Sequence, residues 1–206
     1  MCAGVRSSLV HMHDTARPDT LRLFIGCAID RSGGNMVERT VRQATWAAHW
    51  RMIEPASWHV TALFIGDVPQ GLADRAQQAV ADEACANAPI VLHEGRLQSM
   101  PPDAPTMRWI RFLPNAALTA LHTRLAHRLS LPPSQHDPFW PHITLARARA
   151  GSRHHLELEG QLALPRLVLD SLSLFRSDPG PHGRTYRPVF SRPFSGHVRA
   201  GSDTEP

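Results

Sequence analysis

The sequence predicts an α+β fold with two similar lobes, and two observations lead to it. Apolar runs with the two-residue period of β-strands alternate with stretches that have the 3.6-residue period of helices. The triplet His-x-Thr occurs twice, at His59 and at His142, each time within an apolar run. Each copy follows a predicted helix that itself follows a predicted strand, so a diverged duplication is expected.

The periodicity places each element in turn. Strands are predicted at 21–29, 58–65, 90–97, 107–112, 141–147, 167–176 and 185–190. Helices are predicted from Asn35 to about Trp50, at 72–86, and from Pro114-Asn115 onward. We expect Ser32-Gly33-Gly34 to separate the first strand from the first helix, and Pro188 either to place the last strand at a sheet edge or to end it.

Breaks between the elements suggest the domain boundaries. The Pro-rich stretch 99–105 is incompatible with regular structure and is expected to be a loop. We expect one bilobal domain at 21–194, with disordered extensions at 1–20 and 195–206.

The composition is that of an ordinary globular protein. Of 206 residues, 42% are hydrophobic and 19% are charged, and no apolar run is long enough to span a bilayer. The N-terminal stretch has no signal-peptide pattern, and the three cysteines form no Cys-x-x-Cys pair. We therefore expect a cytoplasmic monomer with no membrane partner, and with Cys27 as a small core residue.

The basic residues are unusual in kind. All 22 are arginine, and the net charge is +4. The planar guanidinium suits phosphate recognition, and the high isoelectric point is compatible with a nucleic-acid partner. Compositional bias is the simpler explanation for the missing lysines, and both interpretations stay open.

The doubled triplet carries the chemistry. Side chains at i and i+2 of a strand point to the same face, so His59 pairs with Thr61, and His142 with Thr144. Two such strands side by side place all four side chains in one pocket. A neutral imidazole can take a proton from a nucleophile, a protonated one can give a proton to a leaving oxygen, and hydroxyls can donate to phosphoryl oxygens. The pattern therefore predicts cleavage of a phosphodiester such as a 2′,3′-cyclic phosphate.

Other chemistries find less support. The groups His136, Asp137 and His142, and His154-His155, have no recognised metal-ligand spacing, so no metal and no other cofactor is expected. No Gly-x-Ser-x-Gly, phosphate-binding glycine-rich loop or dinucleotide fingerprint is present.

The extended surroundings of the two triplets resemble a known family. His59 to Gly66 is similar to a His-φ-Thr-φ-x-Phe-φ-Gly motif, and Pro141 to Arg147 to a Pro-His-φ-Thr-φ-x-Arg motif. The strands at 22–25 and 107–110 also resemble that family's opening and central strands. The family is the RNA 2′,3′-cyclic phosphodiesterases, historically called 2′–5′ RNA ligases, among the two-histidine (2H) phosphoesterases, and the likeness covers roughly residues 21–194.

The resemblance implies antiparallel-rich sheets lining a central cleft, with helices on the outside. It also implies metal-independent hydrolysis of RNA 2′,3′-cyclic phosphate ends to 2′-phosphate ends, with a reverse 2′–5′ ligation. By this likeness His59 and His142 are the catalytic acid–base pair, with the first as acid and the second as base. Thr61 and Thr144 hold the phosphate, and Arg147 contacts it. The partners are then RNA ends or nucleotides that bear a cyclic phosphate.

Strand parity complicates two of the motif residues. Arg147 stands five residues after His142, so an unbroken strand points it to the opposite face, where water would solvate it. It reaches the cleft only if the strand ends or bulges. The same parity places Phe64 opposite His59, in the core. Trp109 and Tyr186 either stack on a base or ribose, or pack in the core.

Two further functions remain open. The same site could act on small cyclic nucleotides or on 2′–5′ linked oligonucleotides. Alternatively, the chain could be a non-catalytic RNA- or nucleotide-binding module that keeps the cleft.

Overall fold

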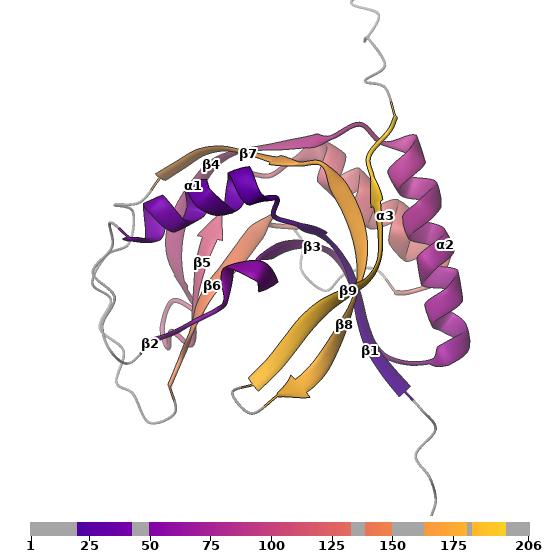
Figure 1. The fold of residues 1–206 in the computed structure, drawn as a ribbon, viewed down its shortest axis with the longest axis horizontal. Helices are drawn as coiled ribbons and strands as arrows, with labels where there is room; N and C mark the ends of the chain where they lie inside the picture. Colours follow the sequence, from indigo (N-terminus) through magenta and orange to yellow (C-terminus); the bar gives the residue numbers. More distant parts are fainter. Residues whose placement is uncertain (1–19, 43–49, 133–138, 150–162, 181–182, 197–206) are drawn as a thin grey trace, which may run out of the picture.

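Strands dominate the architecture (Figure 1). The computed structural model describes residues 20–42, 50–132, 139–149, 163–180 and 183–196. The elements in these ranges are β1 (Thr20–Ala28), α1 (Arg31–Arg42), β2 (Trp50–Met52), the 3₁₀ turn η1 (Pro55–Ser57), β3 (His59–Pro69), α2 (Gln70–Ala86), β4 (Ile90–Met100), β5 (Met107–Arg111), α3 (Ala116–Leu129), β6 (His142–Ala148), β7 (Ala163–Leu169), β8 (Ser171–Gly180) and β9 (Gly183–Pro193). The extensions expected to be disordered lie outside these ranges except at their inner ends.

The strands of the described part form one curled sheet in the order β7-β4-β5-β6-β3-β1-β8-β9, with β2 added to β6 (Figure 1). Every strand pairing in it is antiparallel. The predicted α+β class is therefore confirmed. The two His-x-Thr strands, β3 and β6, are neighbours at the centre, where they pair through Val60 and Ile143. Beyond this junction the chain halves are mixed: β2 adds to β6, while β8 and β9 extend the sheet beyond β1. The division into two similar lobes stays a prediction.

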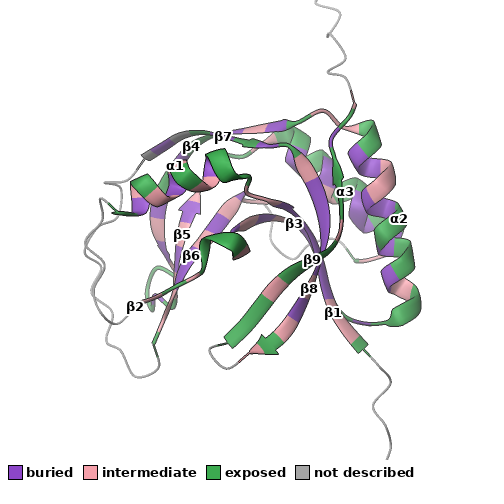
Figure 2. Ribbon diagram, in the orientation of Figure 1, coloured by how far each residue is buried: buried purple, intermediate pink, exposed green. Residues whose placement is uncertain are grey.

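The core lies between the sheet and the helices. Figure 2 shows that α2 and α3 turn exposed faces outward and buried faces toward the strands. On α3 the buried leucines belong to the same hydrophobic cluster as Val60 and Ile143; they are Leu118, Leu121, Leu125 and Leu129. Each such side chain contributes about 1.5–3 kcal/mol by leaving water. Cys27 is fully buried in this cluster, which confirms its predicted role as a core residue, and burial raises the pKa of its thiol.

The first helix departs from the prediction. Helix α1 begins at Arg31, so Ser32-Gly33-Gly34 lies inside it and does not separate it from β1. The cause is Asp30, whose carboxylate accepts the backbone N–H of Gly33 at 2.7 Å and of Ser32 at 3.2 Å. These bonds satisfy donors that the first turn of a helix leaves without partners. Trp50, placed in this helix by its periodicity, belongs to strand β2 instead.

Two strand predictions also change. The apolar stretch 167–176 is divided between β7 and β8, which meet at Asp170. Strand β3 continues past Gly66, which adopts a φ of 92°. As predicted, β9, which contains Pro188, is the last strand in the sheet order. The loop predicted at 99–105 begins only at residue 101, because Ser99 and Met100 belong to β4.

Within the described ranges, none of the helices has the length and apolar character that a membrane crossing requires.

Helices α2 and α3 are joined by a buried ion pair. The Glu83 carboxylate on α2 is 1% exposed and accepts hydrogen bonds from Arg124 Nε at 2.8 Å and Arg128 Nε at 2.7 Å on α3. Burial alone would raise the pKa of Glu83, but the hydrogen bonds and positive charges of the two arginines outweigh it and hold this pKa below its usual value. The pair therefore fixes the spacing of two helices that cover the sheet.

Replacement of Glu83 by Gln is expected to lower the free energy of unfolding by about 2 kcal/mol, because the amide loses the charge that both arginines bind. Urea unfolding at pH 7 measures this. Glu38→Gln is the matched control, since Glu38 pairs with Arg42 across 3.9 Å on the exposed face of α1 and its loss should cost little. Equal unfolding midpoints for the two variants would contradict the assignment.

Candidate active site

The two His-x-Thr motifs line one pocket. It has a volume of about 310 Å³ and is bordered by all five residues singled out from the sequence, namely His59, Thr61, His142, Thr144 and Arg147. Strands β3 and β6 supply them from adjacent positions in the sheet. Val60 and Ile143, the middle residues of the triplets, are fully buried on the opposite face, as strand parity predicts.

Both motif strands contain an extra residue shortly after the threonine. In β3, Thr61 is opposite Gly26 and Leu63 is opposite Ile25, so Ala62 has no counterpart in β1. In β6, Thr144 is opposite Trp109 and Ala146 is opposite Arg108, so Leu145 has no counterpart in β5. Such bulges shift the alternation of side chains by one residue.

The bulges determine on which face of the sheet Arg147 and Phe64 lie. Arg147 borders the pocket on the same face as His142, as it must if the strand bulges. The core position predicted for Phe64 is wrong: its side chain is 55% exposed and also borders the pocket. The two residues occupy equivalent positions, five residues after their histidines.

Each bulge carbonyl has a partner outside the neighbouring strand. His122 on α3 donates Nδ1–H to the carbonyl of Ala62 at 2.7 Å. The backbone N–H of Ile53, just after β2, donates to the carbonyl of Leu145 at 2.8 Å. Because a buried carbonyl without a partner is costly, these bonds stabilise the irregular backbone that the site requires.

The two catalytic candidates have the same hydrogen-bond arrangement. His59 Nδ1 lies 2.7 Å from the Ser57 carbonyl, and His142 Nδ1 lies 3.0 Å from the Trp140 carbonyl. A carbonyl oxygen only accepts, so Nδ1 carries the proton in each neutral ring. Proton exchange with a ligand therefore falls to Nε2 in both.

Aromatic rings hold the imidazoles in place. The centroid of His59 lies 4.7 Å from that of Phe24, which stacks in turn on Phe175. Tyr186 contacts His59 edge-on at 5.2 Å. Trp109 stacks on His142 with centroids 3.9 Å apart. Trp109 and Tyr186 therefore both belong to the site, where they border the pocket.

Partial burial disfavours the charged form of His59 and lowers its pKa to about 4, against 6.5 for a free imidazole. The hydrogen bond to the Ser57 carbonyl acts in the opposite direction, and the charges of His142 and Arg147 lower the pKa further. His59 is consequently neutral at pH 7 in the ligand-free site, the form that accepts a proton.

The pocket is built for an anion. Arg22, Arg147 and Arg184 border it, and the described residues that line it include no acidic side chain. Arg22 is held by Asp67 at 2.6 Å, and Arg184 donates to the hydroxyl and carbonyl of Ser177. Guanidiniums anchored in this way bind phosphate well.

Several of these residues were not identified from the sequence. Phe24 and Arg22 share one face of β1, but their apolar surroundings give the signal of a fully buried strand. The described residues contain no cluster of histidine, cysteine and acidic side chains arranged to hold a metal. His136, Asp137, His154 and His155, weighed as metal ligands, lie outside those residues.

Comparison with known proteins gives a family and a fold. The model of the 2′-5′ RNA ligase superfamily matches residues 39–180, more than half of the chain. Comparison with curated protein sequences finds no match.

Solved structures share the architecture at low identity. The crystal structure of TT0787 of Thermus thermophilus has a TM-score of 0.71 at 20% identity, covering 86% of this chain and 100% of that one. Apo Escherichia coli LigT has a TM-score of 0.67 at 16% identity, covering 84% and 97%. A structure described as a phosphoesterase has a TM-score of 0.67 at 15% identity, covering 86% and 99%. At these identities the likeness establishes the fold.

The low pKa of His59 has a consequence for stability. Between its folded value of about 4 and the unfolded value of 6.5, the unfolded chain binds more protons, so stability falls as the pH falls through this window. From pH 7.5 to pH 5.0, the wild type should lose about 2 kcal/mol more than His59→Gln, by urea unfolding. The same pH dependence in both proteins would show that His59 titrates normally.

Proposed function

The chain belongs to the 2′-5′ RNA ligase superfamily, and on this premise we propose that it hydrolyses RNA 2′,3′-cyclic phosphate ends to 2′-phosphate ends without a metal ion. One observation carries the proposal: two imidazoles and two threonines border one basic pocket, and each imidazole has its Nδ1 bound to a backbone carbonyl. Each ring therefore keeps its Nε2 for proton exchange with a phosphate bound in the pocket.

The reaction exchanges one oxygen at phosphorus for another. A water oxygen forms a bond to phosphorus while one histidine takes its proton. The bond from phosphorus to O3′ breaks, and the other histidine gives its proton to that oxygen, which leaves the phosphate on O2′. General acid and base catalysis of this kind contributes about 10²–10⁴-fold.

The remaining pocket residues bind the phosphate. We assign Thr61 and Thr144 to the non-bridging oxygens, where negative charge accumulates, because they share a strand face with the histidines. Arg147 supplies a positive charge from the end of the same face. Arg-phosphate contacts are strong because the guanidinium presents paired donors.

The order of proton transfer depends on the charge in the pocket. His59 is neutral in the ligand-free site, which is the form a base needs. The family resemblance instead gives it the role of acid, and for that role it must gain a proton as the anionic phosphate binds and raises its pKa.

Ligation follows from the same chemistry. If a 5′-hydroxyl replaces water as the nucleophile, attack on the cyclic phosphate forms a 2′–5′ linkage, and O3′ again leaves. Hydrolysis and ligation thus require the same acid–base pair. They differ in the nucleophile, which is water in hydrolysis and a 5′-hydroxyl in ligation.

His59→Gln and His142→Gln are each expected to lower kcat on an oligoribonucleotide with a 2′,3′-cyclic phosphate end by about 10²–10⁴-fold. The double variant should be little worse than either single one, because the two residues act in one step. Chromatography of the 2′-phosphate product gives the rates. His127→Gln, on the exposed side of α3, is the matched control.

Full activity in either histidine variant would contradict the mechanism. The same assay on 2′,3′-cyclic mononucleotides and on 2′–5′ linked oligonucleotides determines which substrate has the highest kcat/KM. Tight RNA binding without turnover of any of them would instead favour a binding module.

A further inference from the structure

A second pocket of about 310 Å³ adjoins the first. The two are continuous, because they share the bordering residues Ile53, Ser57, Arg147, Arg184 and Tyr186. The second pocket lies between the β2–η1 segment and the start of β9, both of which supply lining residues. The reaction described above gives a role to Arg147 of its lining and none to Arg51, which borders the second pocket alone.

Three arginines from three strands meet in this second pocket. Arg51 comes from β2, Arg147 from β6 and Arg184 from β9. Glu54 is the one acidic residue among its described lining residues, and it is exposed. The pocket therefore has an excess of positive charge.

The register of the sheet places two of these charges face to face. Arg51 on β2 is directly opposite Arg147 on β6. Side chains directly opposite in an antiparallel pair lie on the same face, and like charges there repel each other. A bound anion converts this repulsion into two favourable contacts.

Two of the three arginine side chains, Arg51 and Arg184, also contact the β8–β9 hairpin. A Cβ atom built on Gly183 would lie 2.9 Å from Arg51 Nη2, so the Arg51 guanidinium extends from β2 to the hairpin tip. Gly183 has a φ of 111°, which favours glycine as well. On the hairpin, the bonds from Arg184 to Ser177 fix the third guanidinium. Less side-chain entropy is then lost when a ligand binds.

We infer that this second pocket binds the phosphate that links the cyclic-phosphate nucleotide to the next nucleotide of an RNA chain. An RNA strand carries a phosphate on the far side of the terminal nucleoside, and the second pocket is contiguous with the first on its basic side. The pocket also has apolar lining from Met52, Ile53 and Tyr186, which suits the attached ribose and base. The assignment rests on the proposed function and extends it to a preference for RNA ends over mononucleotides.

The test compares three substrates with the same terminal nucleoside 2′,3′-cyclic phosphate: the mononucleotide, a dinucleotide with a natural linkage, and the same dinucleotide with an uncharged methylphosphonate linkage. The wild type should show at least about tenfold higher kcat/KM for the charged than for the uncharged dinucleotide. Arg51→Met should abolish this ratio and leave mononucleotide turnover within about twofold. Arg51→Lys should restore part of the ratio, because it keeps the charge.

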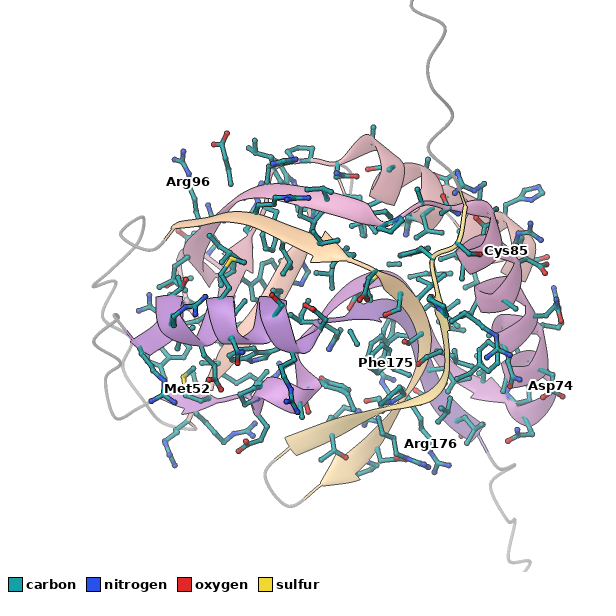
Figure 3. The ribbon with its side chains drawn as sticks, turned by 45° about the horizontal axis from the view of Figure 1, so that its top comes forward. Met52, Asp74, Cys85, Arg96, Phe175 and Arg176 are labelled. Carbon is teal, nitrogen blue, oxygen red and sulfur yellow. The ribbon has the colours of Figure 1, made fainter. Side chains whose placement is uncertain are left out.

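Arg75→Met is the matched control. Arg75 is exposed on α2, next to Asp74, which Figure 3 shows on the opposite side of the molecule from Met52 of β2. In Arg75→Met, the ratio of kcat/KM for the charged dinucleotide to that for the uncharged one should equal the wild-type ratio. Equal kcat/KM for the charged and uncharged dinucleotides in the wild type would overturn the assignment, and so would an equal loss on all three substrates in Arg51→Met.

Failure of the proposed function is a separate outcome, seen as no turnover of any cyclic phosphate by the wild type. The pocket is then tested by the affinity of the charged and uncharged dinucleotides, measured by calorimetry for wild type and Arg51→Met. If the wild type binds the charged dinucleotide more tightly than the uncharged one, and Arg51→Met does not, the phosphate assignment is supported. If the wild type binds both dinucleotides with equal affinity, the assignment is overturned.

Discussion

The site depends on a backbone irregularity common to both His-x-Thr strands, an extra residue directly after each threonine. Without it, strict alternation would turn Phe64 and Arg147 to the buried side of the sheet. The bulges at Ala62 and Leu145 instead bring both to the face of the histidines. Their carbonyls are bound by His122 and by the Ile53 backbone, so elements outside the two strands hold the shape of the cleft.

The same near-symmetry extends to the surroundings of the two histidines. Each imidazole is oriented by the carbonyl two residues before it and packs against an aromatic ring, Phe24 for His59 and Trp109 for His142. In the proposed reaction both imidazoles have the same tautomer, so their surroundings determine which one gives a proton and which one takes it. The two motifs differ at the fifth residue after the histidine. This residue is Arg147 in β6 and Phe64 in β3.

The sequence predicted what depends on local pattern. The period of two placed His59, Thr61, His142 and Thr144 on strand faces, and the two strands do lie side by side. Local pattern could not predict the bulges, because they depend on the register with β1 and β5, which are distant along the chain. Arg51 and Arg184 were missed for the same reason: they meet only through the fold. The residues Ser32-Gly33-Gly34 were predicted to form a turn, but they form the start of α1, because the Asp30 carboxylate accepts the backbone N–H groups of Ser32 and Gly33.

The central claim is that this pair of histidines breaks the bond from phosphorus to O3′ of a cyclic phosphate without a metal. Phosphorus NMR of an oligoribonucleotide with a 2′,3′-cyclic phosphate end, incubated with EDTA-treated protein, tests it most directly. We predict that the cyclic resonance is replaced by that of a 2′-monophosphate at the rate seen without EDTA. A 3′-monophosphate product, or turnover that returns only when a divalent metal is added, would contradict the account.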